Sequence, residues 1–229
     1  MREYKLTRSK RKTIAIKINE DSRLEVRAPL HISQEKIDSF VNSKEKWIAK
    51  HTKEISKKYA LKKEFALNFN DCVFVRGEKN QIHSIKGDTA SYDEEKKVFY
   101  IPELANSYQI KAILIDLYKL IAKSYIHQRV EFFSKQMNVK PTGIRITSAK
   151  TRWGSCSGKN SVNFSWKLIM ADKKTIDYVI VHELAHIKQH NHSPKFWNIV
   201  EEIIPDYKKQ KEKLKVLSEK LSRENWDLK

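Results

Sequence analysis

The chain is poor in the residue types on which several classes of protein depend. Its 229 residues include two cysteines, Cys72 and Cys156, which are too few for a disulfide framework. Five glycines and five prolines beside 40% apolar residues exclude an intrinsically disordered chain. No apolar run approaches the roughly 20 residues of a membrane-spanning helix, and no apolar segment follows the basic start MREYKLTRSKRKT, as a secretory signal would require. We therefore expect a soluble, globular, cytoplasmic protein with no membrane partner.

Acidic residues are also scarce relative to basic ones. The chain has 28 Asp and Glu against 46 Lys and Arg, a formal net charge of +18. This balance favours an anionic partner or substrate, which includes nucleic acids, nucleotides and acidic proteins. The alternative is a lysine-rich solvated surface, because the lysines are scattered along many expected helices. The densest basic clusters, at residues 8–12 and 208–215, lack the interleaved aromatic residues of a base-stacking platform. The charge alone leaves an association with nucleic acid open.

The most informative stretch is residues 176–197, IDYVIVHELAHIKQHNHSPKFW, which contains an HExxH motif from His182 to His186. Residues four apart lie one above the other on a helix, so His182 and His186 can present two imidazoles to one ion. Glu183 lies beside them, where it can take a proton from a metal-bound water. The motif therefore predicts the metal and the general base of a zinc hydrolase.

A third ligand is expected from the segment that follows this helix. His190 continues the i, i+4 stripe, but it would lie about 12 Å from His182 along the helix axis, too far to share an ion whose Zn–N bonds are about 2 Å long. Asn191 tolerates the left-handed conformation that ends many helices, and Ser193-Pro194 is typical of the start of another helix. We therefore expect a turn at 190–192 that brings His192 back to the first two histidines.

Two observations bear on this ligand set. HExxH followed by five residues and His is the ligand spacing of metzincins, although Gln189 stands where they have glycine, so the turn must be built differently. Glu201 or Glu202 on the following helix is a rival third ligand, which we rank behind His192. Structural histidines on a solvated helix are the alternative to a metal site. The helix is apolar nearly all round, however, which implies burial, and buried His and Glu need a partner that a metal ion supplies.

The coarse pattern predicts an α+β protein in two parts. Residues 1–102 form a β-rich part with one helix, residues 103–229 contain the metal motif, and the two are expected to make one continuous unit. The expected elements are a hairpin of residues 13–18 and 24–28, a helix that begins after Ser33 and includes Trp47 and Ile48, a β-rich stretch at 65–101, a long helix at 107–137, strands at 144–147 and 161–169, and a lysine-rich helix after 205.

The loop TRWGSCSGKN, between the last two expected strands, offers two further candidates. Arg152 could hold a carboxylate or a phosphate beside the metal. The alternative is a structural arginine bonded to loop carbonyls. A reactive Cys156 would need a nearby base or a helix N-terminus, and three histidines already supply a catalytic zinc site with its open fourth position. We therefore interpret Cys156 as a packing residue.

Three segments of the sequence together resemble the YgjP-like family of predicted metal-dependent hydrolases, which is related to the SprT- and WLM-like metallopeptidases. These segments are RWGSCS at 152–157, VNFSWKL at 162–168 and DYVIVHELAHIKQHNHSPKFW at 177–197. SKRKTIAIKI, LEVRAP and the helix around Trp47 are similar to the front of that family. The resemblance implies a zincin-like second half, in which the HExxH helix packs on a long helix and a small sheet. It also implies His182, His186 and His192 as zinc ligands and Glu183 as the catalytic acid and base.

The leading hypothesis for function is a zinc metallopeptidase in which Glu183 activates a zinc-bound water to attack a peptide carbonyl. Residues 161–169 would form the sheet edge that pairs with an extended peptide, which makes Asn163 a substrate-binding candidate beside Arg152. The resemblance also implies an alternative, a metal-dependent pyrophosphatase acting on UTP at the same site, although the sequence has no phosphate-binding glycine loop. A second alternative is a basic nucleic-acid-binding module with a structural zinc.

Overall fold

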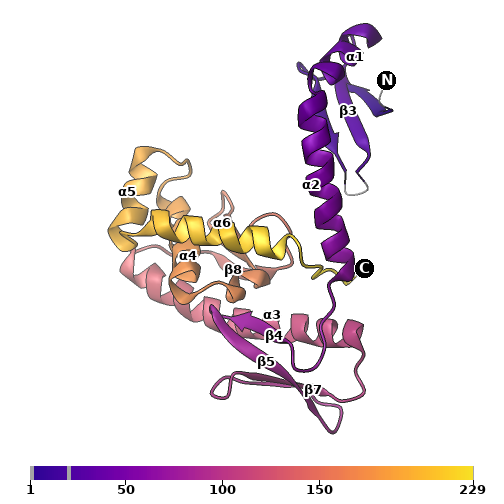
Figure 1. Ribbon diagram of the computed structural model, residues 1–229. Helices are drawn as coiled ribbons and strands as arrows, with labels where there is room; N and C mark the ends of the chain where they lie inside the picture. Colours follow the sequence, from indigo (N-terminus) through magenta and orange to yellow (C-terminus); the bar gives the residue numbers. More distant parts are fainter. Residues whose placement is uncertain (1–2, 20–21, 229) are drawn as a thin grey trace. The chain divides into compact units, whose positions relative to one another are not determined.

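The computed structural model describes residues 3–19 and 22–228, which fold as two compact units. The first contains Met1–Phe65 and Leu221–Asn225, and the second contains Ala66–Lys220 and Trp226–Lys229. Figure 1 shows the elements of each unit. Within the described residues, no helix has both the length and the apolar character needed to cross a membrane.

The first unit packs two helices against a three-stranded sheet. Its elements are β1 (Lys5–Ser9), β2 (Ala15–Ile18), β3 (Leu24–Pro29), α1 (Gln34–Ser43) and α2 (Glu45–Glu64). The predicted hairpin is confirmed, since β2 pairs antiparallel with β3, although residues 20 and 21 of its turn lie outside the described residues. The sheet has the order β1-β3-β2, and β1 adds to β3 in parallel. Its core includes Val26, Ile37 and Ile48, each at most 2% exposed.

The single helix predicted after Ser33 is wrong, because the structure divides it at Lys44. In a continuous helix the Lys44 N–H would donate to the Phe40 carbonyl. The Ser43 hydroxyl donates to that carbonyl instead, over 2.7 Å, and the Lys44 N–H donates to Val41 over 3.0 Å. This competition between a serine hydroxyl and the helix backbone separates α1 from α2.

The second unit contains the remaining elements and most of the buried side chains. Its four-stranded sheet, in the order β4-β5-β7-β6, confirms the β-rich stretch predicted at 65–101. The 30-residue helix α3 confirms the predicted long helix and begins with a capping box made by Asn106 and Gln109. The elements are β4 (Cys72–Val75), β5 (Glu78–Ile85), β6 (Ser91–Asp93), β7 (Val98–Pro102), α3 (Ser107–Gln136), β8 (Gly143–Thr147), β9 (Gly154–Cys156), β10 (Ser161–Ser165), the 3-10 helix η1 (Trp166–Met170), α4 (Lys173–Lys188), α5 (Pro194–Ile203) and α6 (Tyr207–Leu221).

The predicted α+β class is confirmed, and the contacts of α3 explain where the compact units divide. The buried Tyr118 of α3 donates a hydrogen bond to the Phe74 carbonyl of β4 over 2.9 Å, and its ring contacts Phe99 of β7 and Trp166 of η1. The four-stranded sheet therefore shares its core with α3, and the compact units divide after Phe65. Whether the functional parts of the chain divide at 102, as expected from the sequence, stays a prediction.

This shared core leads to a prediction about stability. Replacing Phe99, which is fully buried between Tyr92 and Tyr118, with alanine is expected to lower the free energy of unfolding of the second unit by about 3–5 kcal/mol, because the lost apolar burial leaves a cavity. Urea denaturation followed by circular dichroism would measure the change. The control is Leu104→Ala at a side chain that is 92% exposed, where a change within about 0.5 kcal/mol is expected. Equal effects of the two substitutions would contradict the shared core.

Helix α4 is capped by its own N-cap residue and contacts two other helices through polar side chains. The N-cap, Asp172, accepts a hydrogen bond from the Thr175 N–H over 3.1 Å. The Thr175 hydroxyl lies 3.0 Å from Gln210 of α6 in a buried hydrogen bond. Farther along α4, Asp177 accepts two hydrogen bonds from the Arg129 guanidinium of α3, over 2.7 and 2.8 Å, in the planar geometry that pairs arginine with carboxylates. Helices α3 and α6 therefore hold the first half of α4.

Candidate metal centre

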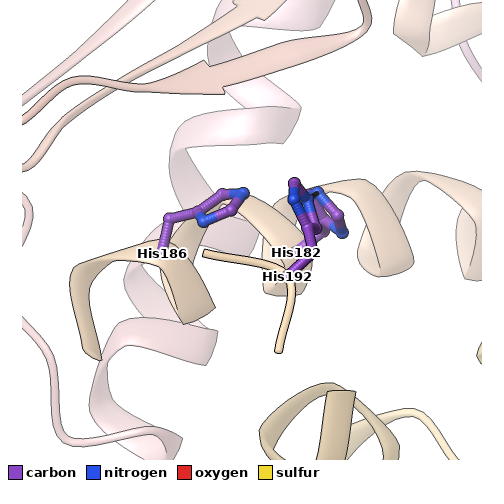
Figure 2. A group of neighbouring side chains, drawn as sticks. All are labelled: His182, His186 and His192. Carbon is purple, nitrogen blue, oxygen red and sulfur yellow. Dashed lines mark hydrogen bonds between the residues drawn. The ribbon is translucent and has the colours of Figure 1, made fainter. Parts of the chain in front are cut away.

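The structure brings His182, His186 and His192 together. One ligand nitrogen from each of these residues lies within 4.8 Å of the other two. The first two histidines are one turn apart on α4, and the third lies in the segment between α4 and α5. Figure 2 shows the His186 ring directed toward the other two rings. The Nε2 atoms of His182 and His192 are 3.1 Å apart, close to the roughly 3.3 Å between two nitrogens bound to one tetrahedral zinc.

The segment that positions His192 differs in detail from the turn predicted at 190–192. Helix α4 ends at Lys188, with Gln189 in an extended conformation. Asn191, whose tolerance of the left-handed conformation suggested the turn, is not among the described residues with positive φ. Its side-chain oxygen instead accepts hydrogen bonds from Gln189 Nε2 over 2.7 Å and from the Ser193 N–H over 3.2 Å. This Asx-type turn closes the segment around His192, and α5 then begins at Pro194 with Ser193 as its N-cap.

The electrostatics of the three rings fit a bound cation. Burial, followed by His186, His192 and Lys211, lowers the pKa of His182 to about 3. Burial also lowers the pKa of His186, so both rings are neutral near pH 7 and can offer a lone pair. His182 Nδ1 is buried and has no hydrogen-bond partner among the described residues, while His182 Nε2 faces His192. A neutral imidazole is a ligand that zinc accepts.

The remaining candidate ligands lie outside this group. Among the described residues, these histidines form the one group of three or more His, Cys, Asp or Glu side chains whose ligand atoms lie this close together. Glu201 and Glu202 are exposed on α5, and His190 is exposed just before His192. In the imidazole ring of His186, the Nδ1 atom lies 3.3 Å from the Gln189 carbonyl. A hydrogen bond from Nδ1 to a carbonyl fixes the tautomer that leaves Nε2 free to bind a metal.

Glu183 is buried beside the histidines, at 6% exposure. Burial raises the pKa of Glu183 to about 7, while the backbone N–H of Cys156 and then the charge of Arg152 act in the opposite direction. A carboxyl group with a pKa near the working pH is suited to accept a proton and later return it. Arg152 itself is exposed, two residues before β9 begins at Gly154.

The small sheet beside α4 corrects the expectation for residues 161–169. Only residues 161–165 form a strand, β10, and residues 166–170 continue as the 3-10 helix η1. The sheet has the order β8-β10-β9, so β10 is its central strand and not an edge that could pair with a peptide. Asn163 lies in β10 and donates to the Ser155 hydroxyl over 3.3 Å. Both sides of β10 are already paired, and the edge nearest α4 belongs to the three-residue strand β9.

Sequence reasoning missed the contribution of β9 to this site. Cys156, interpreted as packing, donates its backbone N–H to the Glu183 carboxylate, and Gly154 lies directly against the Glu183 side chain. Burial, followed by the charge of Glu183, raises the pKa of the Cys156 thiol, which opposes formation of a reactive thiolate. The glycine within RWGSC was the available signal, because glycine often marks a close approach of the backbone to another group.

Comparison with known proteins finds a matching family and a similar solved structure. A family model described as YgjP-like, metallopeptidase domain, matches residues 12–217. No curated protein matches the chain. Among solved structures, the metallopeptidase zymogen of Pyrococcus abyssi abylysin matches with 24% sequence identity and a TM-score of 0.38, over 43% of this chain and 97% of that chain. Since the family model spans most of the sequence, the chain belongs to the YgjP-like family of metallopeptidase domains.

Proposed function

We propose that this protein is a zinc-dependent peptidase whose metal is held by His182, His186 and His192 and whose general base is Glu183. The observation that supports the proposal is the convergence of three histidine nitrogens within 4.8 Å, next to a carboxyl group that is only 6% exposed. The family description supplies the reaction class, peptide hydrolysis. The net charge of +18 is compatible with acidic stretches in a protein substrate.

The roles of the residues follow from their positions. A zinc ion held by the three imidazoles would supply Lewis acidity, which polarises the peptide carbonyl and lowers the pKa of water. Glu183 accepts the proton of the attacking water and can pass it to the leaving nitrogen as the C–N bond breaks. Burial around Glu183 excludes bulk water from this transfer. Arg152 and Asn163 stay predictions as substrate-binding residues, and the exposed Arg152 has the freedom to bind a substrate carboxylate.

The proposal is tested by offering the zinc-loaded protein an unfolded, casein-like protein and, separately, UTP. We expect new amino groups from the casein, and we expect their formation to stop with a chelator, to resume when zinc is restored and to be lost in His182→Ala. If the protein instead released pyrophosphate from UTP in a reaction that depends on zinc and on His182, and left the casein intact, its activity would be that of a pyrophosphatase and not of a peptidase. Zinc binding with neither substrate consumed, together with salt-dependent binding of nucleic acid, would favour the binding module.

A further inference from the structure

The side chain of Glu183 is in unusually close contact with the backbone of β9. A Cβ atom placed on Gly154 would lie 2.6 Å from both Cγ and Oε1 of Glu183, and 2.8 Å from its Cδ. Real Cβ atoms do not approach other heavy atoms so closely, so a side chain at position 154 would force the Glu183 side chain to move. The contact also has a polar part, because the Cys156 N–H donates a hydrogen bond to the Glu183 carboxylate.

The hydrogen-bond pattern of β9 explains why this N–H is available. Trp153 accepts a backbone hydrogen bond from β10 over 2.8 Å, and Ser157 donates one to β10 over 2.9 Å. In an antiparallel pair, alternate residues turn their backbone groups toward the partner strand and away from it. Gly154 and Cys156, between these residues, therefore direct their N–H and C=O groups toward the open edge of the sheet. That edge faces α4, which contacts β9.

We propose that β9 is a positioning element for Glu183, in which the Cys156 N–H orients the carboxylate and the absence of a side chain at Gly154 lets α4 and β9 approach closely enough to form that bond. The inference rests on the proposed function, since it assigns a catalytic purpose to the position of Glu183. A glutamate has three side-chain torsions, and catalysis requires its carboxylate to be held to within a fraction of an ångström. Burial limits these torsions, and the directed hydrogen bond selects one orientation.

Further contacts hold β9 in place. Trp153, the residue before Gly154, donates its indole N–H to the Ser218 hydroxyl of α6 over 3.0 Å. At the other end of the strand, Ser161 donates its backbone N–H to the Ser157 hydroxyl over 3.1 Å. The Cys156 N–H that donates to Glu183 therefore belongs to a strand that is held at both ends. Such outer contacts keep the residues of a metal site in position.

The first test uses the scarcity of cysteine. Labelling the full chain with 15N-cysteine gives two amide signals, from Cys156 and from Cys72 in β4, and the second serves as an internal control. In the zinc-loaded protein, Glu183→Ala removes the acceptor, and we expect the Cys156 amide to exchange with solvent about tenfold faster or more. Glu183→Gln, which keeps a neutral acceptor, is expected to lie in between, with Cys72 unchanged. Exchange of Cys156 that is the same in all three proteins would overturn the proposal.

The second test compares two glycines of the same loop. Gly154→Ala is expected to lower kcat by about 10–100-fold with little change in KM or zinc content, since a misplacement of roughly 1 Å at a catalytic group can cost about 100-fold. Gly158→Ala is the matched control, because a Cβ at Gly158 has no heavy atom within 4 Å, and its activity should equal that of the wild type. If the two variants were equally active, the positioning role would be contradicted. It would also be contradicted if Gly154→Ala lost its zinc while its Cys72 amide signal, the control for an intact fold, stayed unchanged.

A double substitution separates positioning of Glu183 from a general disturbance of the site. If Gly154 acts through Glu183, adding Gly154→Ala to Glu183→Gln should change the residual rate by less than about twofold, because residues that act as a unit are strongly non-additive. If the effects of the two substitutions on the rate were fully additive, the proposal would be wrong. The amide exchange of Cys156 does not depend on the substrate. If the protein cleaves no peptide but the Cys156 amide shows the expected exchange, the proposed peptidase activity is wrong, while the contact between Cys156 and Glu183 is supported.

Discussion

Replacing Glu183 with glutamine is expected to slow peptide hydrolysis by about 10²–10⁴-fold, the range in which general acid–base catalysis contributes, while zinc content stays at the wild-type level. Glutamine has nearly the shape of glutamate, so it fits the buried position against Gly154, but it cannot accept the proton of the attacking water. Because Glu183 is not among the three proposed ligands, metal affinity should be little changed. Initial rates on a fluorogenic peptide, with zinc measured in the same samples, provide the test.

The matched control for this substitution is Glu201→Gln, at an exposed carboxylate on α5 outside the ligand group. Its rate should remain within about twofold of the wild type, as is usual for surface substitutions of small energetic effect. If Glu183→Gln were as active as Glu201→Gln, Glu183 would not be the base. If Glu183→Gln instead lost its zinc, Glu183 would be supporting the metal site.

The second large effect is expected from His192→Ala, which should weaken zinc binding by more than about 100-fold. Substituting a residue that only supports a ligand typically lowers metal affinity by up to about 100-fold, and loss of a ligand itself should cost more. Removing one of three imidazoles leaves His182 and His186, which share one face of α4, as a two-nitrogen site. Competition against a chromophoric chelator at fixed pH measures the affinity. The activity of the zinc-supplemented variant should fall in parallel.

His190→Ala is the control for His192→Ala, since it removes the same side chain two positions earlier from an exposed site outside the ligand group. Its zinc affinity should remain within about twofold of the wild type. Should His192→Ala bind zinc as tightly as His190→Ala, the third ligand would have to come from elsewhere. Glu201 and Glu202, the rival ligands considered from the sequence, would then be the next residues to replace.

The parts of the fold that were predictable from the sequence are those set by local patterns. The long helix α3 follows from a run of apolar residues at helical spacing without glycine or proline, and the start of α5 follows from Ser193-Pro194. Likewise, the i, i+4 spacing of His182 and His186 was sufficient to predict that their rings would lie side by side. The convergence of His192 required only a turn close to these two residues in the chain.

The parts that were not predictable depend on contacts between distant residues. β10 was expected at a sheet edge, but the partner of each strand is decided by pairing across the sheet, and β8 and β9 cover both of its sides. The strand β9 has three residues, too few for an alternation of apolar and polar positions to be visible. The contact of Gly154 with Glu183 joins residues 29 positions apart in the sequence. Its role is therefore visible only in three dimensions.

The segment between α4 and α5 also bears on how quickly the metal would exchange. His192 follows His186 by six residues, and the side chain of Asn191 holds the backbone between them through Gln189 and Ser193. Such a short, closed tether gives the third imidazole a high effective concentration at the other two. An imidazole that dissociates from the ion would therefore bind it again before the ion can diffuse away. Opening of the Asn191 turn would lower this effective concentration, so exchange of a bound metal is expected to be faster when the turn opens.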